Sequence, residues 1–528
     1  MKSFGCGNGG LSHWRRYLGG VCVIGLSSWG FQADAAEWNV QPRLTVSETY
    51  TDNVRLSGGV GFGGFGGLGG LGSGSEFITQ ISPGVNITGE GRRFKSNLDY
   101  TLNNLIYAKN ERFQVRNQLN TDATAEIIKH HFFVDGRATI SQQNAFLFGP
   151  QAPDNASLTG NRRNIYMWNI SPYVRQRFSN LASGEVRYIH GEVSSNTNSF
   201  SNSSSDAAVF SLNSGSAFRT FGWGINYSHT QIDRKYSGPN LGRLQTIELE
   251  RTTGMLRYAV TSHFNLIGTA GYERNSFISI RGRTSSPLWT VGFSWTPTKR
   301  TKIDASGGKR FFGNTYAASV DHRTRSTVWN LSYMEDISTF GQQSLAGGSI
   351  LNASMLSQLF SGVQGGEALL NQGLSSSFAD PNNFLTNRLF LLRRLQASLA
   401  LNGKKNSLVF RGFNYSRKSF SSDEEDADLI GIDNAALTRN TTQVGGNLLW
   451  NHRLSPRTNA NINLGYIRTS YDVTSQEDDN IIVTAGLNKR FTSNISGSIM
   501  YYHLHRESNR SNGSYDANAI TATLNMNF

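Results

Sequence analysis

The chain has 528 residues and a formal net charge of +13, and 38% of its residues are hydrophobic while only 16% are charged. Mean hydropathy is −0.38 and no continuous apolar run is long enough to cross a bilayer as a helix, which excludes a helical membrane protein. The 31 Phe, 19 Tyr and 9 Trp exclude a disordered chain, because such chains are poor in aromatic residues.

Residues 1–35 predict a signal peptide. A basic start is followed by the short apolar stretch YLGGVCVIGL and by an A-x-A cleavage site that ends at Ala35. Both cysteines of the chain, Cys6 and Cys22, lie in this segment. The exported protein, residues 36–528, is therefore expected to contain neither a disulfide nor a cysteine metal site.

Strict two-residue alternation recurs through residues 36–528. In WTVGFSW (289–295) the apolar residues occupy the odd positions and Thr, Gly and Ser the even ones, and 166–174, 221–227 and 481–491 follow the same rule. Alternation of this kind predicts strands with one apolar and one polar face. In 132–140, Phe133 is an exception on the polar face.

The strands are long, the polar face carries Asn, Ser, Thr, Gly and Arg, and aromatic residues often end the apolar face. These features favour a membrane barrel over a soluble sandwich, because a sheet in lipid satisfies its backbone only by closing on itself. We therefore predict an all-β fold, a transmembrane antiparallel up-and-down β-barrel of about 20 strands, within a range of roughly 16 to 22.

The connections fall into two classes. Short turns are expected at 297–300, 402–405, 455–458 and 492–494, and long polar loops at 143–163, 195–206 and 421–439. Short periplasmic turns and long external loops are typical of such barrels. The Gly-rich stretch 58–75 is expected to be an external loop rather than a phosphate cradle, because no helical pattern follows it. Strand direction fails to alternate across 336–387, which is therefore treated as an insert of unknown placement, with a short helix expected at 349–360.

The last residues, ITATLNMNF, alternate strictly and end on an aromatic residue. The pattern resembles the terminal signal that the barrel insertion machinery reads in bacterial outer-membrane barrels. The resemblance implies that this last strand seals against the first one. The residues expected to form the signal are Ile520, Ala522, Leu524, Met526 and Phe528.

A set of arginines falls on the polar faces of the predicted strands, where a lumen lined by guanidinium groups would concentrate anions. The alternative is that these arginines pair with lumen acids such as Asp135 and Glu185 and only make the interior wet and rigid. The candidate anion-facing residues are Arg137, Arg175, Arg177, Arg187, Arg257, Arg394 and Arg490.

Other polar clusters predict no chemistry. The acidic stretch SSDEEDAD (421–428) is interpreted as a solvated external loop, with a calcium site as the alternative. His503, His505 and Glu507 share one face of a strand but lack converging ligands from a neighbour, so no metal is expected. No catalytic residues, no cofactor and no nucleic-acid partner are predicted, and the chain is not expected to be an enzyme.

The stretch AEWNVQPRLTVSETYTDNVRL (36–56), FLLRRLQASLAL (390–401) and the terminal Phe528 together resemble the outer-membrane proteins associated with the PEP-CTERM/exosortase sorting system. That resemblance implies a link to exopolysaccharide export or surface organisation in a Gram-negative envelope. It provides no catalytic residues.

These observations predict a porin-like barrel in the cell outer membrane that conducts or exports polysaccharide or small anions. The expected partners are outer-membrane lipids and lipopolysaccharide, the barrel insertion machinery and components of polysaccharide export. The alternative is a structural or adhesive surface barrel with a plugged lumen.

Overall fold

The computed structural model describes residues 37–58, 74–196, 200, 202–235, 244–345, 384–511 and 513–528. The predicted signal peptide, most of the Gly-rich stretch 58–75 and most of the insert 336–387, including the helix expected at 349–360, lie outside these residues.

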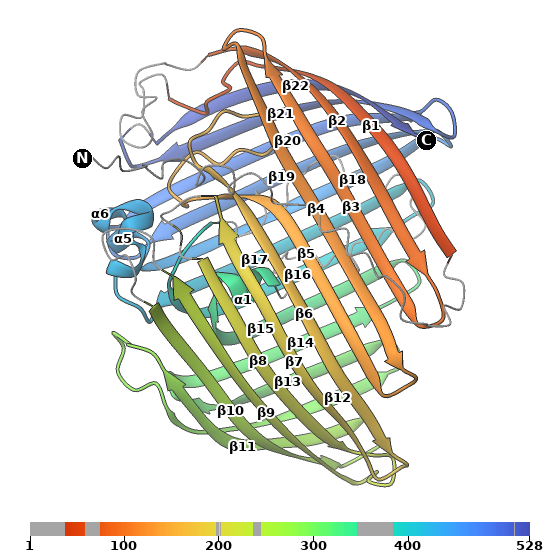
Figure 1. The fold of residues 1–528 in the computed structure, drawn as a ribbon, viewed down its shortest axis with the longest axis vertical. Coiled ribbons are helices and arrows are strands. Elements are labelled where there is room, and N and C mark those ends of the chain that lie inside the picture. Colours follow the sequence, from red (N-terminus) through yellow and green to blue (C-terminus); the bar gives the residue numbers. More distant parts are fainter. Residues whose placement is uncertain are drawn as a thin grey trace, which may run out of the picture.

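The described residues form an all-β, closed, antiparallel barrel of 22 strands (Figure 1). The predicted fold class is thus confirmed, and the count lies at the upper limit of the expected range. The strands are β1 (Glu37–Thr51), β2 (Glu76–Glu90), β3 (Phe94–Tyr107), β4 (Arg112–Ile128), β5 (Phe132–Asn144), β6 (Arg162–Phe178), β7 (Ala182–Ser195), β8 (Asn202–Ser214), β9 (Phe221–Lys235), β10 (Leu244–Ala259), β11 (Phe264–Ser276), β12 (Ser286–Thr298), β13 (Thr301–Arg310), β14 (Gly313–Arg323), β15 (Thr327–Thr339), β16 (Leu389–Asn402), β17 (Asn406–Ser419), β18 (Asn440–Ser455), β19 (Thr458–Tyr471), β20 (Gln476–Arg490), β21 (Ile495–Ser508) and β22 (Tyr515–Asn527).

Each strand pairs with its neighbours in sequence, and β1 closes the ring by pairing with β22 from Arg43↔Asn527 to Thr51↔Ala519. The expectation that the last strand seals against the first is therefore confirmed. Across the seam between β1 and β22, the Thr45 Oγ1 hydroxyl donates a hydrogen bond to Asn525 Oδ1 at 2.8 Å. Every strand thereby gains two neighbours, which is what an antiparallel sheet needs to leave no edge in lipid.

The connections at one end of the barrel are all short, and the long connections all lie at the other end. The turns 299–300, 403–405 and 456–457 join strands at the end where the chain leaves β22, and the connections 145–161 and 420–439 lie at the other end. β15 and β16 pair antiparallel from Thr327↔Leu401 to Thr339↔Leu389, so the insert joins two adjacent strands at the long-loop end. Strand direction therefore alternates normally across the insert, because β15 runs toward the long-loop end and β16 runs back from it.

The outer surface carries an apolar band with aromatic edges. On β12, Trp289, Val291 and Trp295 are exposed by 52%, 61% and 42%, while Thr290 and Gly292 point inward between them. β1 begins with the exposed Trp38 at the short-turn end and reaches the exposed Tyr50 at the long-loop end. Aromatic residues at both edges of an apolar belt suit the two interfaces of a bilayer.

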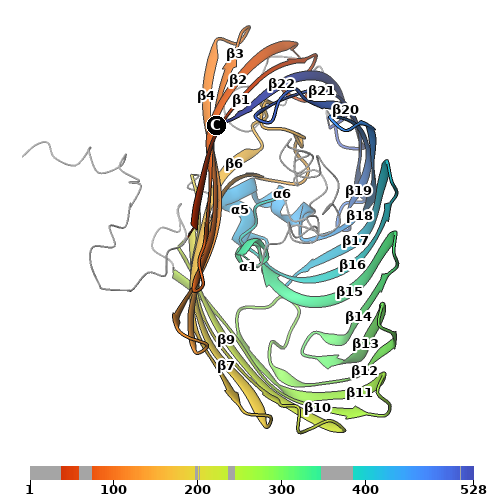
Figure 2. The same cartoon turned by 90° about the vertical axis from the view of Figure 1, so that its right-hand side faces the viewer.

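Three short helices, α1 (Phe340–Leu345), α5 (Glu424–Ile430) and α6 (Ile432–Leu437), lie within the ring of strands rather than outside it (Figure 2). Among the described residues, none of the helices has the length and apolar character needed to cross a membrane.

Candidate functional site

Strand register and alternation place all seven predicted arginines on inward-facing rows. Arg177 precedes the outward Phe178 on β6, and Arg187 lies between the outward Val186 and Tyr188 on β7. The same reasoning applies to the others, which alternate with outward apolar residues on their strands: Arg137, Arg175, Arg257, Arg394 and Arg490.

Two of these arginines, Arg175 and Arg187, form ion pairs with Asp135 and Glu185, the lumen acids that the sequence suggested as partners. Arg187 Nη1 lies 2.9 Å from Asp135 Oδ2 and its Nε lies 3.0 Å from Glu185 Oε1. Arg175 Nη2 donates to Glu185 Oε2 at 2.8 Å. The alternative in which lumen arginines pair with lumen acids therefore holds for Arg175 and Arg187. Their charges are balanced by carboxylates and do not act alone on a passing anion.

An aromatic stack supports this ion-pair cluster. Phe133 and Tyr173 lie face to face with ring centroids 5.1 Å apart, and the Arg187 guanidinium is 3.7 Å from the centre of the Tyr173 ring. Cation–π contact and stacking explain why Phe133 breaks the alternation of β5, because its ring faces the lumen to pack on Tyr173.

The remaining arginines have weaker partners or none in the described chain. Arg137 lies opposite Asp122 in the β4–β5 register. Arg257 Nη2 donates to the Phe218 carbonyl at 3.3 Å, and Arg394 lies 3.6 Å from the Met334 sulfur. Arg177 and Arg490, near the short-turn end, form no ion pair with any residue that the structure describes. Of the seven predicted arginines, those with no carboxylate partner among the described residues are therefore Arg177, Arg257, Arg394 and Arg490.

Three segments, 145–161, 384–388 and 420–439, lie inside the ring of strands at its long-loop end, and we call them the loop plug (Figure 2). They meet in one apolar cluster with Tyr471 of β19. All its buried members are exposed by less than 10%: Ala145, Phe146, Leu147, Phe148, Phe384, Ile430, Ala435, Leu437 and Tyr471. A shared apolar core of this kind holds the loops together by burial of apolar surface.

Arg388 is the central charge of the loop plug. Its side chain is fully buried, and it lies 3.3 Å from Asp423 and 3.4 Å from Asp426. Its Nη2 also donates to the Ala435 carbonyl at 2.7 Å. Asp426 in turn accepts hydrogen bonds from the Thr386 hydroxyl and the Asn387 backbone N–H, both at 2.7 Å.

A second buried arginine ties the loop plug to the barrel wall. Arg234 of β9 lies 3.1 Å from Glu425 and donates to the Asn387 carbonyl. The interpretation of 421–428 as a solvated external loop is therefore wrong for three of its five carboxylates. Asp423, Glu425 and Asp426 face Arg234, Arg388 and Arg439 inside the barrel, where a buried charge requires a partner, whereas Glu424 and Asp428 are exposed.

Arg506 of β21 anchors the other side of the loop plug. It is 1% exposed, lies 2.8 Å from Asp478 and donates to the Phe148 carbonyl at 3.0 Å. Sequence reasoning missed Arg234, Arg388 and Arg506. The only available signal was the excess of acids in 421–428, which requires cations from elsewhere if it is buried.

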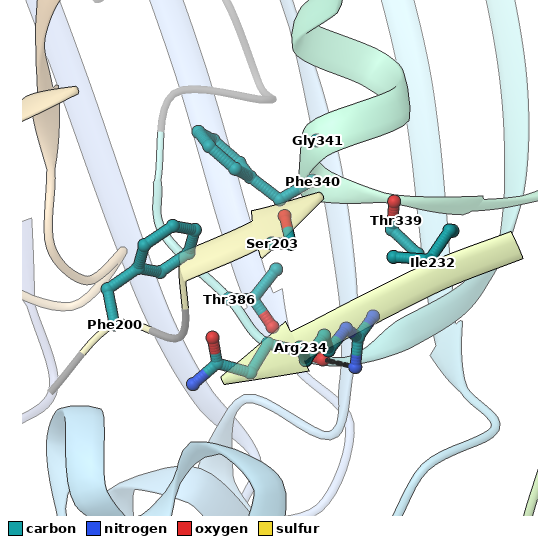
Figure 3. A pocket seen from close by; sticks show the side chains of 9 residues that line it. Phe200, Ser203, Ile232, Arg234, Thr339, Phe340, Gly341 and Thr386 are labelled. Atoms are coloured by element: carbon teal, nitrogen blue, oxygen red, sulfur yellow. Dashed lines mark hydrogen bonds between the residues drawn. The ribbon is translucent and has the colours of Figure 1, made fainter. Parts of the chain in front are cut away.

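A small pocket lies between β9, the end of β15 and the loop plug (Figure 3). Its charged lining residue, Arg234, is already held by Glu425 and Asn387. The rest of the lining is apolar or uncharged: Phe200, Ser203, Ile232, Thr339, Phe340, Gly341, Thr386 and Asn387. No carboxylate, histidine or cysteine is among the described residues that line the pocket.

The histidines considered as metal ligands have local partners on the outward row. His503 Nδ1 lies 2.9 Å from Asn518 Oδ1, and His505 Nδ1 lies 2.6 Å from Asp516 Oδ1. Within the described ranges, no group of three or more His, Cys, Asp and Glu side chains is arranged to hold a metal ion.

We expect the loop plug to loosen in acid. The hydrogen bond from Arg439, together with the charge of Arg388, lowers the pKa of Asp423 below its ordinary value of 3.8, against the effect of burial. A carboxylate with a depressed pKa contributes stability above its unfolded-state pKa, and that stability is lost as the pH falls below about 4.

Ion conductance of the reconstituted barrel, measured from pH 7 downward, checks this expectation. Conductance should rise in the acid range for the native chain. In Asp423→Asn the loop plug should be loosened at neutral pH, so that the acid step is smaller. An identical acid step in both proteins would contradict the role of Asp423.

No family model matches this chain, and no curated protein does. Among solved structures it is similar to the siderophore receptor PirA from Pseudomonas aeruginosa (10% identity, 93% of this chain and 80% of that chain, TM-score 0.46). It is also similar to PirA from Acinetobacter baumannii (9% identity, 92% and 80%, TM-score 0.47) and to the ferric-catecholate import receptor Fiu from E. coli K12 (9% identity, 92% and 81%, TM-score 0.42). None of these likenesses bears on what this chain binds.

Proposed function

We propose that this chain is an outer-membrane conduit for an acidic polysaccharide or for small anions, as part of exopolysaccharide export. The observation that carries the proposal is the excess of inward-facing arginines with no carboxylate partner in the described chain, namely Arg177 and Arg490 together with Arg257 and Arg394. Guanidinium groups bind carboxylates and phosphates through forked hydrogen bonds, and a lumen of one charge sign concentrates the opposite ions.

The rest of the lumen wall supports passage of a hydrated polymer. On β8, the inward positions carry small side chains, four of them polar: Ser203, Ser205, Ala207, Val209, Ser211 and Asn213. Such a surface offers hydrogen bonds to sugar hydroxyls without large apolar contacts that would retain the chain. The loop plug occupies lumen space at the long-loop end, so passage of a polymer on that side requires that it move.

Ion selectivity of the reconstituted barrel tests the conduit. We expect the native chain to prefer anions, and the double variant Arg177→Glu/Arg490→Glu to shift the reversal potential toward cation preference. Arg468→Glu is the matched control, because Arg468 lies on the outward row of β19 and pairs with Asp479 at 2.8 Å. A barrel with no anion preference, or a double variant indistinguishable from the control, would refute the proposal.

The second candidate is a structural or adhesive surface barrel whose lumen stays closed. The tightly packed core of the loop plug favours it, because Arg388 and Ala435 have no exposed surface. The two candidates separate when the helical part of the loop plug, 424–437, is replaced by a short Gly-Ser linker. A conduit should gain conductance, whereas a barrel closed for structural reasons should remain silent and lose surface binding instead.

A further inference from the structure

The turns at the short-turn end follow one another around one mouth of the barrel, and we call them the short-turn rim (Figure 2). They are 91–93, 129–131, 179–181, 215–220, 260–263, 299–300, 324–326, 403–405, 456–457 and 491–494. These turns contain no Asp or Glu, and their Lys and Arg residues are all exposed: Arg92, Arg93, Lys129, Arg219, Lys299, Arg300, Arg325, Lys404, Lys405 and Arg457. The formal charge of the short-turn rim is therefore exclusively positive.

The cations are densest in four consecutive turns, which join β12 to β13, β14 to β15, β16 to β17 and β18 to β19. Neighbouring strands lie about 4.8 Å apart, so successive turns lie about 10 Å apart along the rim. This spacing is close to the Debye length of about 10 Å at 0.1 M salt, so the fields of adjacent turns add together. We call the cations of these four turns the cationic arc: Lys299, Arg300, Arg325, Lys404, Lys405 and Arg457.

The carboxylates on the strands next to the cationic arc do not balance it. Asp304 lies 2.9 Å from Lys302 Nζ, and Asp321 accepts a hydrogen bond from the Asn330 amide at 2.7 Å. A further cation, Arg453 of β18, donates to the Lys404 carbonyl at 2.7 Å. The two acids therefore offset Lys302 and Arg453 at most, and the charge of the cationic arc remains in excess.

Positive charge also continues from the rim into the lumen. Arg177 and Arg490 are exposed on inward rows, and they lie two residues before turn 179–181 and one residue before turn 491–494. The outward rows instead end in apolar residues, such as Phe178 and Leu454, exposed by 52% and 53%. Because lipid does not reach the inward rows, this arrangement suits an anion that arrives from water at the mouth.

The other end of the barrel has no such uniform sign. Its described connections expose acids, such as Glu111 and Asp472, together with bases such as Arg283. Glu424 and Asp428 of the loop plug are exposed there as well. A polyanion therefore meets attraction at the short-turn mouth and mixed charge at the long-loop end, which makes the two mouths unequal for such a ligand.

We propose that the short-turn rim captures a carboxylated polysaccharide from the aqueous compartment that it faces, with the cationic arc as the main contact, and that the polymer enters the barrel through this mouth. A guanidinium group holds a carboxylate through two parallel N–H donors, and lysines add point charges. Exposed contacts of this kind are weak singly and gain strength by repetition on both partners. Entry of the polymer rests on the conduit proposed above, whereas capture at the rim requires no open lumen.

Fluorescence anisotropy of a labelled oligogalacturonate, titrated with the full-length barrel in non-ionic detergent, tests the capture. A neutral malto-oligosaccharide of the same length is the control ligand. We expect the native chain to bind the acidic oligomer and not the neutral one. Binding should weaken steeply between about 50 and 200 mM salt, because salt screens exposed charges. Equal affinity for the two oligomers would overturn the proposal.

A variant of the cationic arc assigns the site. Removal of four exposed cations should weaken binding of oligogalacturonate about tenfold and flatten its salt dependence. Folding is checked by the mobility difference between boiled and unboiled samples. The substitutions are Lys299→Gln, Arg300→Gln, Lys404→Gln and Lys405→Gln. Native affinity in this variant would overturn the proposal.

The matched control removes the same number of charges at the long-loop end. Its four cations are exposed, so the net charge of the protein changes by the same amount as in the arc variant. We expect this control to keep native affinity, and a loss equal to that of the arc variant would show that only net charge matters and overturn the proposal. The substitutions are Lys109→Gln, Arg112→Gln, Arg274→Gln and Arg283→Gln.

A repeat of the titration in phosphatidylethanolamine nanodiscs separates polymer capture from contact with lipid headgroups, because this lipid offers phosphates without net charge. Binding that persists supports capture, and binding that disappears would show that lipid phosphates cover the cations and overturn it. The conduit is judged separately by ion selectivity. A chain that binds oligogalacturonate without anion preference would keep the rim and refute the conduit, whereas an anion-selective chain that binds no oligomer would refute the rim alone.

Discussion

Replacing Arg388 with methionine should open the barrel. The side chain is fully buried between Asp423 and Asp426, so its removal leaves two carboxylates in the loop plug without their main cation. Breaking a buried ion pair by deleting one partner destabilises by about 3–5 kcal/mol. That energy acts on the packing of the loop plug and not on the strand ladder, because Arg388 precedes β16 and takes no part in its pairing. We therefore expect a several-fold rise in single-channel conductance with the barrel still folded.

The control for this experiment is Arg468→Met. Arg468 pairs with Asp479 on the outer surface and its side chain is 47% exposed. Exposed pairs of this kind contribute about 0–1 kcal/mol, so conductance and melting should be almost unchanged. If Arg388→Met and Arg468→Met conduct alike, the loop plug does not close the lumen in the way the contacts of Arg388 indicate.

An arginine substituted into β22 should prevent membrane insertion of the barrel when it faces the lipid, but not when it faces the lumen. Leu524 points outward in β22 and is 40% exposed, whereas its neighbour Thr523 points into the lumen. Arginine on the lipid face of a barrel costs about 2–4 kcal/mol near the bilayer midplane, and lumen substitutions are tolerated. We expect Leu524→Arg to lose most of its heat-modifiable folded band in liposomes, while Thr523→Arg keeps it.

The same pair of variants tests the terminal signal. Ile520, Leu524 and Phe528 are all exposed on the outward face, as the alternation in the sequence predicts. If Thr523→Arg fails as badly as Leu524→Arg, the strand is sensitive to any charge, and the assignment of faces in β22 is wrong.

Strand existence could be predicted from the sequence because alternation is a local signal. WTVGFSW indicated both the strand β12 and the face of each residue, and the same holds for YMWNISPYV on β6. The strand count was less secure near the insert, where β15 and β16 are separated by more than 40 positions and only their register shows that they are neighbours.

The loop plug could not be predicted, because its contacts are made between segments that are distant in sequence. SSDEEDAD looks solvated on composition alone, and three of its carboxylates, Asp423, Glu425 and Asp426, are held inside the barrel only because Arg234 lies on β9 and Arg388 just before β16. In the same way, the lumen position of Phe133 was predicted as an exception, but the reason for it is Tyr173 on the next strand. Polarity patterns predict which face a residue occupies and not which partner it meets there.

The pairing of β1 with β22 has a consequence for biogenesis. Thr49 and Thr521, whose hydroxyls lie 2.9 Å apart, are among the first and the last residues of the cylinder to leave the ribosome. No cotranslational intermediate can possess the finished seam, since half of it is not yet made. Formation of such long-range contacts is slow because a very large loop must close first. The exported chain should therefore spend an extended time as an unsealed sheet that needs periplasmic holdase chaperones, and depletion of these chaperones should send it to proteases before it reaches the surface.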